Sequence, residues 1–198
     1  LIMKLKVGIL DYEGGGNISS IRNALNNFDV DVELVNSSLK NIDKLILPGV
    51  GSYKKGSESI NPFREAIKEY SQTNHILGIC LGMQLLCKKG FEFGESTGLG
   101  LVDGECVKIN TSQPLPHIGW SKVDVINSSK LLRGIRRKEF YFMHSYEVIN
   151  YTDVKCLTDY FGHKIVSVLE NENIFGVQFH PERSGKSGLK LIENFLEI

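Results

Sequence analysis

Two glycines flank a cysteine at the junction between an apolar run and a helical pattern, and this segment constrains the fold more than any other. Cys80 directly follows an apolar run from His75 to Ile79, and Gly78 and Gly82 are its second neighbours on either side. A tight turn from a strand into a helix leaves no room for side chains beside its apex, and glycine meets that requirement. The pattern predicts a nucleophile elbow. The simpler alternative is a buried cysteine between two packing glycines.

Cys80 is the candidate nucleophile of this elbow. At the apex, its sulfur would lie at the N-terminus of the following helix, where the helix dipole and free backbone N–H groups favour the thiolate. A cysteine nucleophile also needs a base, and the base needs a group that orients it. The rest of the chain therefore has to supply these two groups.

A histidine and a carboxylate near the end of the chain could serve as base and orienting group. His180 and Glu182 flank Pro181, and residues two apart on an extended segment point to the same side. One imidazole nitrogen of His180 could then face Cys80 while Glu182 binds the other. The alternative is that this segment simply ends a strand.

Acyl transfer from a cysteine also requires hydrogen-bond donors for the tetrahedral oxyanion. The backbone N–H of Leu81, directly after the nucleophile, is one candidate. Another is the segment Pro48, Gly49, Val50 and Gly51, whose glycines allow a peptide to rotate and approach a substrate closely. The alternative is an ordinary glycine-rich turn. The lysine that a phosphate loop requires is missing after this segment, which excludes a P-loop.

Composition places the chain among ordinary globular proteins. Its 198 residues are 41% hydrophobic, and 23 basic residues balance 23 acidic ones for a net charge of zero. A neutral chain has no global basic field that would recruit nucleic acid or an anionic membrane. The cysteines contain no C-x-x-C pair, so neither a zinc site nor a redox motif is indicated. Without an export signal, free thiols in a reducing cytoplasm are expected; the cysteines are Cys80, Cys87, Cys106 and Cys156.

Strand and helix patterns alternate through the first half of the chain, which is typical of an α/β fold. Strands are expected at 6–10, 30–35, 44–47 and 75–79, and helices at 18–28, 63–70 and 81–87. In the second half, strands are expected at 106–109, 121–126, 139–142, 154–157, 164–169 and 174–179, before a helix at 189–196. We predict one domain over residues 1–198. It would hold a mostly parallel central sheet flanked by helices on both faces, with a smaller antiparallel excursion in the second half.

The elbow and the His180–Glu182 pair together resemble a class I (triad) glutamine amidotransferase. Further stretches resemble the family of glutaminase subunits of imidazole glycerol phosphate synthase, and the resemblance covers essentially the whole chain. These stretches are Asp11–Tyr12, Gly16–Asn17, Leu47–Gly51, Gly98–Leu101, His117–Trp120, His144–Tyr146 and Gln178–Arg183.

The resemblance implies a reaction and a set of site residues. Cys80 would attack the side-chain amide of glutamine, and His180, oriented by Glu182, would transfer the protons. No cofactor or metal is implied. The residues implied to bind glutamine are Gln84, Glu92, His144, Ser145 and Tyr146. Reorientation of residues 49–51 is implied to switch the activity on, so the oxyanion site is expected not to be formed without a partner.

The resemblance also implies a partner, a separate (β/α)8 cyclase subunit that forms a heterodimer and receives the ammonia for histidine biosynthesis. Trp120 and Tyr141 are candidates for an apolar docking patch, with core packing as the alternative. One departure bears on the partner. The loop at Glu13 is one residue longer than the family pattern, and a paralogous glutaminase that feeds a surface-sugar amidotransferase is the alternative.

Two further alternatives change the activity itself. A γ-glutamyl hydrolase or protease-like cysteine hydrolase could use the same elbow, and would turn over without a partner. A regulatory subunit without enzymatic activity could keep the fold, although the presence of Cys80, His180 and Glu182 argues against it.

Overall fold

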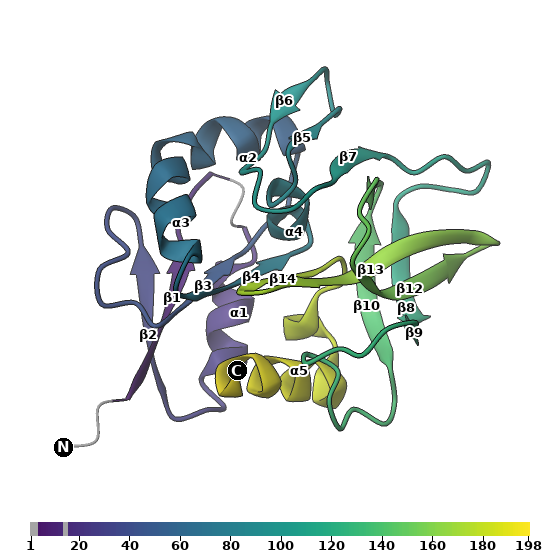
Figure 1. Cartoon of the computed structure of the whole chain (residues 1–198). Coiled ribbons are helices and arrows are strands. Elements are labelled where there is room, and N and C mark those ends of the chain that lie inside the picture. The colour runs from purple at the N-terminus through teal and green to yellow at the C-terminus, as the bar shows by residue number, and fades with distance from the viewer. Residues whose placement is uncertain (1–3, 14–15) are drawn as a thin grey trace.

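The computed structural model describes residues 4–13 and 16–198 and consists of a central sheet between two layers of helices (Figure 1). The predicted loop around Glu13 extends into Gly14 and Gly15, which lie outside the described residues. The central sheet has eight strands. In spatial order they are β2 (Val30–Val35), β1 (Leu5–Leu10), β3 (Lys44–Leu47), β4 (His75–Ile79), β14 (Ile174–Val177), β13 (His163–Asn171), β12 (Val154–Tyr160) and β9 (Asp124–Val125).

The first five strands of this order are parallel, and the remaining three are added antiparallel. The mostly parallel sheet predicted from the alternating pattern is therefore confirmed, with β2, β3 and β4 at the predicted bounds. Both faces of the central strands are apolar because both are covered. Leu45 and Leu47 of β3 pack into one core, and Ile46 between them packs into the other.

The helices divide between the two faces as predicted. Helices α1 (Ile18–Leu25) and α5 (Gly185–Glu197) bury their apolar residues in one core. Helices α2 (Tyr53–Ile60), α3 (Arg64–Ser71) and α4 (Leu81–Leu85) pack in the other, and a 3₁₀ turn, η1 (Asn61–Phe63), joins α2 to α3. Figure 1 shows α1 and α5 on the opposite side of the sheet from α3.

Helix α2 is absent from the predicted elements because its sequence lacks a full apolar stripe. Its buried residues fall at helical spacing, but two of the four are Gly56 and Ser57 rather than large apolar side chains. Helix α4 ends at Leu85, earlier than the predicted residue 87. The carbonyl groups of Leu85, Leu86 and Cys87 accept hydrogen bonds from the 99–102 segment instead of continuing the helix.

The second half of the chain also contains the predicted antiparallel excursion, as two smaller sheets. One pairs β10 (Glu139–His144) with β8 (His117–Lys122), and the other has the order β11 (Tyr146–Ile149), β7 (Glu105–Lys108), β5 (Lys89–Gly90) and β6 (Ser96–Thr97). The predicted strand at 121–126 is wrong. It covers the end of β8 and all of β9, which belong to different sheets and are separated by Val123, a residue outside both strands.

In the ranges that the structure describes, no helix is both long enough and apolar enough to cross a membrane. All four cysteines are free thiols, as expected.

Candidate active site

The predicted elbow is present at the carboxyl end of β4, where Cys80 lies between the strand and α4. Its backbone has φ 52° and ψ −108°, a conformation that a non-glycine residue rarely adopts and that usually marks a functional position. Only 5% of the Cys80 surface is exposed. The thiol is thus held at the turn by the backbone and is almost fully buried.

The two flanking glycines are required by close backbone contacts. A Cβ on Gly78 would lie 2.7 Å from the carbonyl of Gly82, and a Cβ on Gly82 would lie 2.8 Å from the carbonyl carbon of Leu47. Real Cβ atoms do not approach backbone this closely. The glycines therefore permit both the sharp turn and the contact between α4 and the end of β3.

The predicted base and orienting group meet beside the elbow. The Nδ1 atom of His180 lies 2.8 Å from Oε1 of Glu182, and the side chains of these residues are 1% and 0% exposed. Since a carboxylate can only accept, Nδ1–H is the donor and Nε2 is left for Cys80. Burial alone would lower the pKa of His180, but the neighbouring Cys80 and Glu182 raise it to about 10, while Nε2 itself makes no hydrogen bond among the described residues. A protonated imidazole beside the thiol is the form these neighbours favour.

The expected extended geometry holds for His180 but not for Glu182. His180 is extended, with φ −102° and ψ 94°, whereas Pro181–Arg183 form a 3₁₀ turn, η2. The turn forms because the N–H groups of Arg183 and Ser184 donate to the carbonyls of His180 and Pro181. The carboxylate therefore reaches Nδ1 by folding back, not by sharing one side of a strand.

The glycine-rich segment after β3 lies directly against the elbow. A Cβ on Gly49 would be 2.6 Å from Cβ of Leu81 and 2.7 Å from the nitrogen of Gly82. Gly51 has φ +115°, which glycine adopts easily. The structure thus places Gly49, the start of this segment, against Leu81 and Gly82, at the carboxyl ends of neighbouring parallel strands, where ligands of such sheets bind.

Three of the five residues expected to bind glutamine meet around one backbone carbonyl. The carbonyl oxygen of Tyr146 accepts from Nε2 of Gln84 at 3.1 Å and from Nδ1 of His144 at 2.8 Å. Ser145 lies between His144 and Tyr146 in the chain. Its backbone carbonyl accepts a hydrogen bond from the N–H of Ile109 at 3.0 Å.

Glu92 is separated in sequence from Gln84, His144 and Tyr146, but its charge affects the pKa of Tyr146. Its Oε2 accepts from the backbone N–H of Tyr53 at 2.5 Å, at the start of α2. Burial and the Glu92 carboxylate raise the pKa of Tyr146. A carboxylate near the first turn of a helix is favoured by the helix dipole.

A second histidine, His117, supports His144. Because Nδ1 of His144 donates to Tyr146, its Nε2 must accept from Nδ1 of His117 at 3.2 Å, and Ser121 then donates to Nε2 of His117 at 2.8 Å. Burial lowers the pKa of His117 to about 4 and that of His144 to about 3. Both rings are therefore neutral at neutral pH, as these hydrogen bonds require.

Two polar residues that contact the site have no role in the sequence patterns. Gln178 is fully buried, and its Nε2 donates to Sγ of Cys80 at 3.6 Å while its Oε1 accepts from Gln84 at 3.1 Å. A single amide inside the apolar run 174–179 is the available signal. The other residue is Asn17, which binds both Glu182 and Gly49.

Replacing Gln178 with leucine is expected to lower kcat/KM for the glutamine hydrolysis that the resemblance implies about 10- to 100-fold, because a hydrogen bond to the sulfur once it becomes charged for attack is worth roughly 1.5–3 kcal/mol. Alkylation of Cys80 by iodoacetamide should slow in parallel. The exposed Gln72 provides the matched control, and Gln72→Leu should leave both rates unchanged. A wild-type kcat/KM for Gln178→Leu would show that the contact with sulfur has no catalytic effect.

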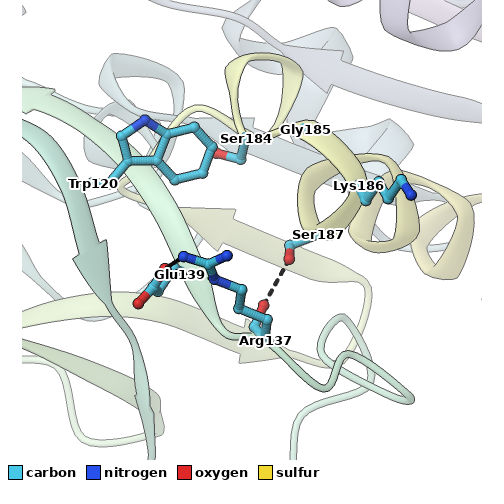
Figure 2. Close-up of a pocket in the computed structure, with 7 residues that line it drawn as sticks. All are labelled: Trp120, Arg137, Glu139, Ser184, Gly185, Lys186 and Ser187. Carbon is cyan, nitrogen blue, oxygen red and sulfur yellow. Dashed lines mark hydrogen bonds and ion pairs between the residues drawn. The ribbon is translucent and has the colours of Figure 1, made fainter.

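The two candidate docking residues lie beside this site. Trp120 is 57% exposed, so core packing does not explain it, whereas Tyr141 is half-buried, with its ring 6.3 Å from the indole. Trp120 lines a cavity of about 570 Å³. Figure 2 shows the residues around it. Ser184, also in its lining, donates to the carbonyl of His180 at 2.6 Å. The cavity therefore adjoins the backbone that carries the candidate base; its other lining residues are Arg137, Glu139, Gly185, Lys186 and Ser187.

Comparison with known proteins agrees with this geometry. Residues 9–198 match the family described as glutamine amidotransferase class-I. The chain is 40% identical to the imidazole glycerol phosphate synthase subunit HisH of Pelagibacter ubique, over 98% of this chain and 100% of that protein. It is 41% identical to the subunit of the same name from Methanocaldococcus jannaschii, over 97% and 99% of the two chains.

The fold is also shared with a solved structure of lower sequence identity. PurLQS from Thermotoga maritima superposes with a TM-score of 0.79 at 21% identity, covering 98% of this chain and 99% of that one. Taken with the elbow and its buried histidine, these matches place the chain in the class-I glutamine amidotransferase family of enzymes and, within it, among the HisH subunits.

Proposed function

We propose that this chain is the glutaminase subunit of an imidazole glycerol phosphate synthase. It would hydrolyse glutamine to glutamate and ammonia and pass the ammonia to a separate (β/α)8 cyclase subunit in the cytoplasm. The observation that carries the proposal is the meeting of Cys80, strained at its elbow, with the buried pair of His180 and Glu182. Relatives at 40% and 41% identity carry the name of that synthase subunit.

The chemistry follows from the roles of these three residues. The Cys80 thiolate attacks the side-chain amide carbon of glutamine and forms a tetrahedral oxyanion. His180 then gives the proton on Nε2 to the leaving nitrogen, so that ammonia departs and a glutamyl thioester remains. In the second half, His180 takes a proton from water, which attacks the thioester and releases glutamate and the thiolate. Glu182 keeps Nδ1 protonated throughout.

The oxyanion needs backbone donors, and one of the candidates already has another partner. The N–H of Gly49 donates to Oδ1 of Asn17 at 3.1 Å. The role in the oxyanion site therefore falls to the N–H of Leu81 and to Val50 or Gly51. Gly51 has a φ of +115°, and a glycine can leave or enter this region without a Cβ clash, which supports a switch that a partner operates.

The proposed substrate residues form one wall of the site. Gln84, His144 and Tyr146 are joined by hydrogen bonds, and a rigid wall of this kind orients a substrate with little loss of its own freedom. Ser145 and the carboxylate of Glu92 would complete the pocket, and Glu92 suits the α-amino group of glutamine.

The decisive experiment measures ammonia release by the purified chain, alone and with the cyclase plus its nucleotide substrate. We expect a low rate alone and a rise of at least about 100-fold in the complex, because misplaced oxyanion donors cost about that factor. High activity of the free chain on γ-glutamyl peptides would instead indicate a hydrolase. The absence of any binding to the cyclase would favour a different synthase, for example one that amidates a surface sugar.

The loop at Glu13 is the feature that bears most on the choice between these synthases. The N–H of Glu13 donates to Oγ of Ser59 on α2 at 2.7 Å, so the loop is tied to the helix that follows residues 49–51. Exchange of residues 12–17 for the shorter family pattern tests whether the loop selects the partner.

Replacing Trp120 with alanine is expected to weaken binding to the cyclase about 30-fold or more, because an exposed aromatic side chain at the centre of an interface typically contributes at least about 2 kcal/mol. Isothermal titration calorimetry would measure the affinity. Phe93 is 76% exposed on the hairpin between β5 and β6, so Phe93→Ala is the matched aromatic control and should bind normally. Equal affinities for the two variants would show that Trp120 lies outside the interface.

A further inference from the structure

Asn17 lies between two parts of the active site that are remote in sequence. Its Nδ2 donates to Oε1 of Glu182 at 2.8 Å, and its Oδ1 accepts from the N–H of Gly49 at 3.1 Å. The orientation of the amide is unambiguous, because a carboxylate can only accept and a backbone N–H can only donate. We infer that Asn17 is a positioning residue that joins the orientation of the triad carboxylate to that of the oxyanion segment.

The side chain of Asn17 makes these two hydrogen bonds instead of capping the helix. Asn17 occupies the N-cap position of α1, where asparagine usually binds the free N–H groups of the first helical turn. It makes no such capping bond here. Only 9% of Asn17 is exposed, so its amide is withdrawn from water and both of its hydrogen bonds are made within the site.

On the oxyanion side, Asn17 acts together with Tyr12. The hydroxyl of Tyr12 donates to the carbonyl of Pro48 at 2.5 Å, and Asn17 accepts from the N–H of Gly49. These two groups belong to one peptide unit, so both of its ends are held. Rotation of the segment must then begin at the next peptide, between Gly49 and Val50, which carries the Val50 N–H proposed for the oxyanion.

On the triad side, Asn17 fixes the carboxylate that orients His180. Oε1 of Glu182 accepts from both Nδ1 of His180 and Nδ2 of Asn17, each at 2.8 Å, whereas Oε2 has no partner in the described part of the chain. The carboxylate is therefore held by the same oxygen that holds the imidazole. Any movement of Asn17 changes the direction in which Glu182 presents that oxygen.

Asparagine is the side chain that fits this position. Aspartate would keep the acceptor for Gly49 but replace the donor to Glu182 with a second carboxylate. Alanine would remove both bonds. The two variants therefore separate the two contacts, and this design rests on the proposed roles of Cys80, Glu182 and residues 49–51.

The test measures glutamine hydrolysis by Asn17→Ala and Asn17→Asp in the complex with the cyclase. Both should lower kcat about 10- to 100-fold with less than about a threefold change in the KM for glutamine, because a small misplacement of catalytic groups costs about that factor. A role in loop packing alone would be retained by the nearly isosteric Asn17→Asp. Asn23, exposed on the same helix, gives the control variant Asn23→Ala, which should behave as wild type.

Nuclear magnetic resonance of the full chain gives a second readout that does not depend on activity. In Asn17→Ala, the amide peak of Gly49 and the Nδ1 proton of His180 should both shift. In Asn17→Asp, the Gly49 peak should stay near its wild-type position while the His180 proton shifts. Should Asn17→Ala fail to fold, Asn17→Asp alone still tests the contact with Glu182.

The outcomes distinguish this inference from the proposed function. Wild-type kcat in Asn17→Asp, or unmoved Gly49 and His180 signals in Asn17→Ala, would overturn the role of Asn17. If Cys80→Ala still hydrolyses glutamine, the proposed triad is wrong, whatever the Asn17 variants do. If Cys80→Ala is inactive and the Asn17 variants are wild type, only the positioning role fails.

Discussion

Replacing Cys80 with alanine is expected to lower glutamine hydrolysis by the assembled complex by about 10⁴-fold or more, because no thioester can form without the sulfur. The fold should be retained, since alanine removes one atom from a side chain whose backbone is held by β4 and α4. Ammonia production from glutamine is the measurement. Cyclase activity with added ammonia should be unchanged, because that reaction does not use the glutaminase site.

The same variant tests the electrostatics of the site. The neighbouring Cys80 is one of the causes that raise the pKa of His180 to about 10, against the effect of burial. Removal of the sulfur should therefore lower the pKa of His180. The chemical shift of a His180 ring carbon, followed against pH by nuclear magnetic resonance, would detect this change. The buried Cys156 provides the matched control, and Cys156→Ala should keep wild-type glutaminase activity. A Cys80→Ala complex that still releases ammonia would contradict the assignment of the nucleophile.

Replacing Gly82 with alanine is expected to destabilise the protein by about 3 kcal/mol or more and to abolish glutaminase activity. The new Cβ would overlap the carbonyl oxygen of Leu47 and lie 2.8 Å from its carbon. Both contacts are with backbone, so neither can be relieved by a side-chain rotation. Either α4 or the end of β3 must move, and β3 leads directly into residues 48–51. Thermal unfolding should show a decrease in Tm on the order of 10 °C.

Gly56 on α2 gives the matched control for this substitution. A Cβ there would lie 3.1 Å from Leu81 and 3.2 Å from Leu85, but only from the ends of their flexible side chains. Alanine also favours a helix over glycine by roughly 1 kcal/mol, which offsets that contact. Gly56→Ala should therefore unfold within a few degrees of wild type, and equal losses of stability in the two variants would show that the elbow contact is not special.

Local residue patterns were sufficient for the elbow, the parallel strands and the candidate triad. Glycines on both sides of Cys80 are typical of a tight turn, and the short apolar runs at β3 and β4, in a chain that alternates with helical patterns, favour buried strands between two helical layers. The patterns failed where burial does not follow apolar composition. Helix α2 buries Gly56 and Ser57, and the segment 121–126 divides between two sheets although its sequence is consistent with a single strand.

The sequence by itself thus determined the candidate thiol, its candidate base and the layers of the fold. Only the tertiary structure decided which polar groups surround that thiol. Gln178 reaches the sulfur, and Asn17 reaches both Glu182 and Gly49, across separations of 98, 165 and 32 residues. The physical reason is that a side-chain amide makes hydrogen bonds with whatever group the packing of the strands brings to it. Periodicity and spacing describe neighbours along the chain, whereas these partners meet only where the carboxyl ends of parallel strands converge.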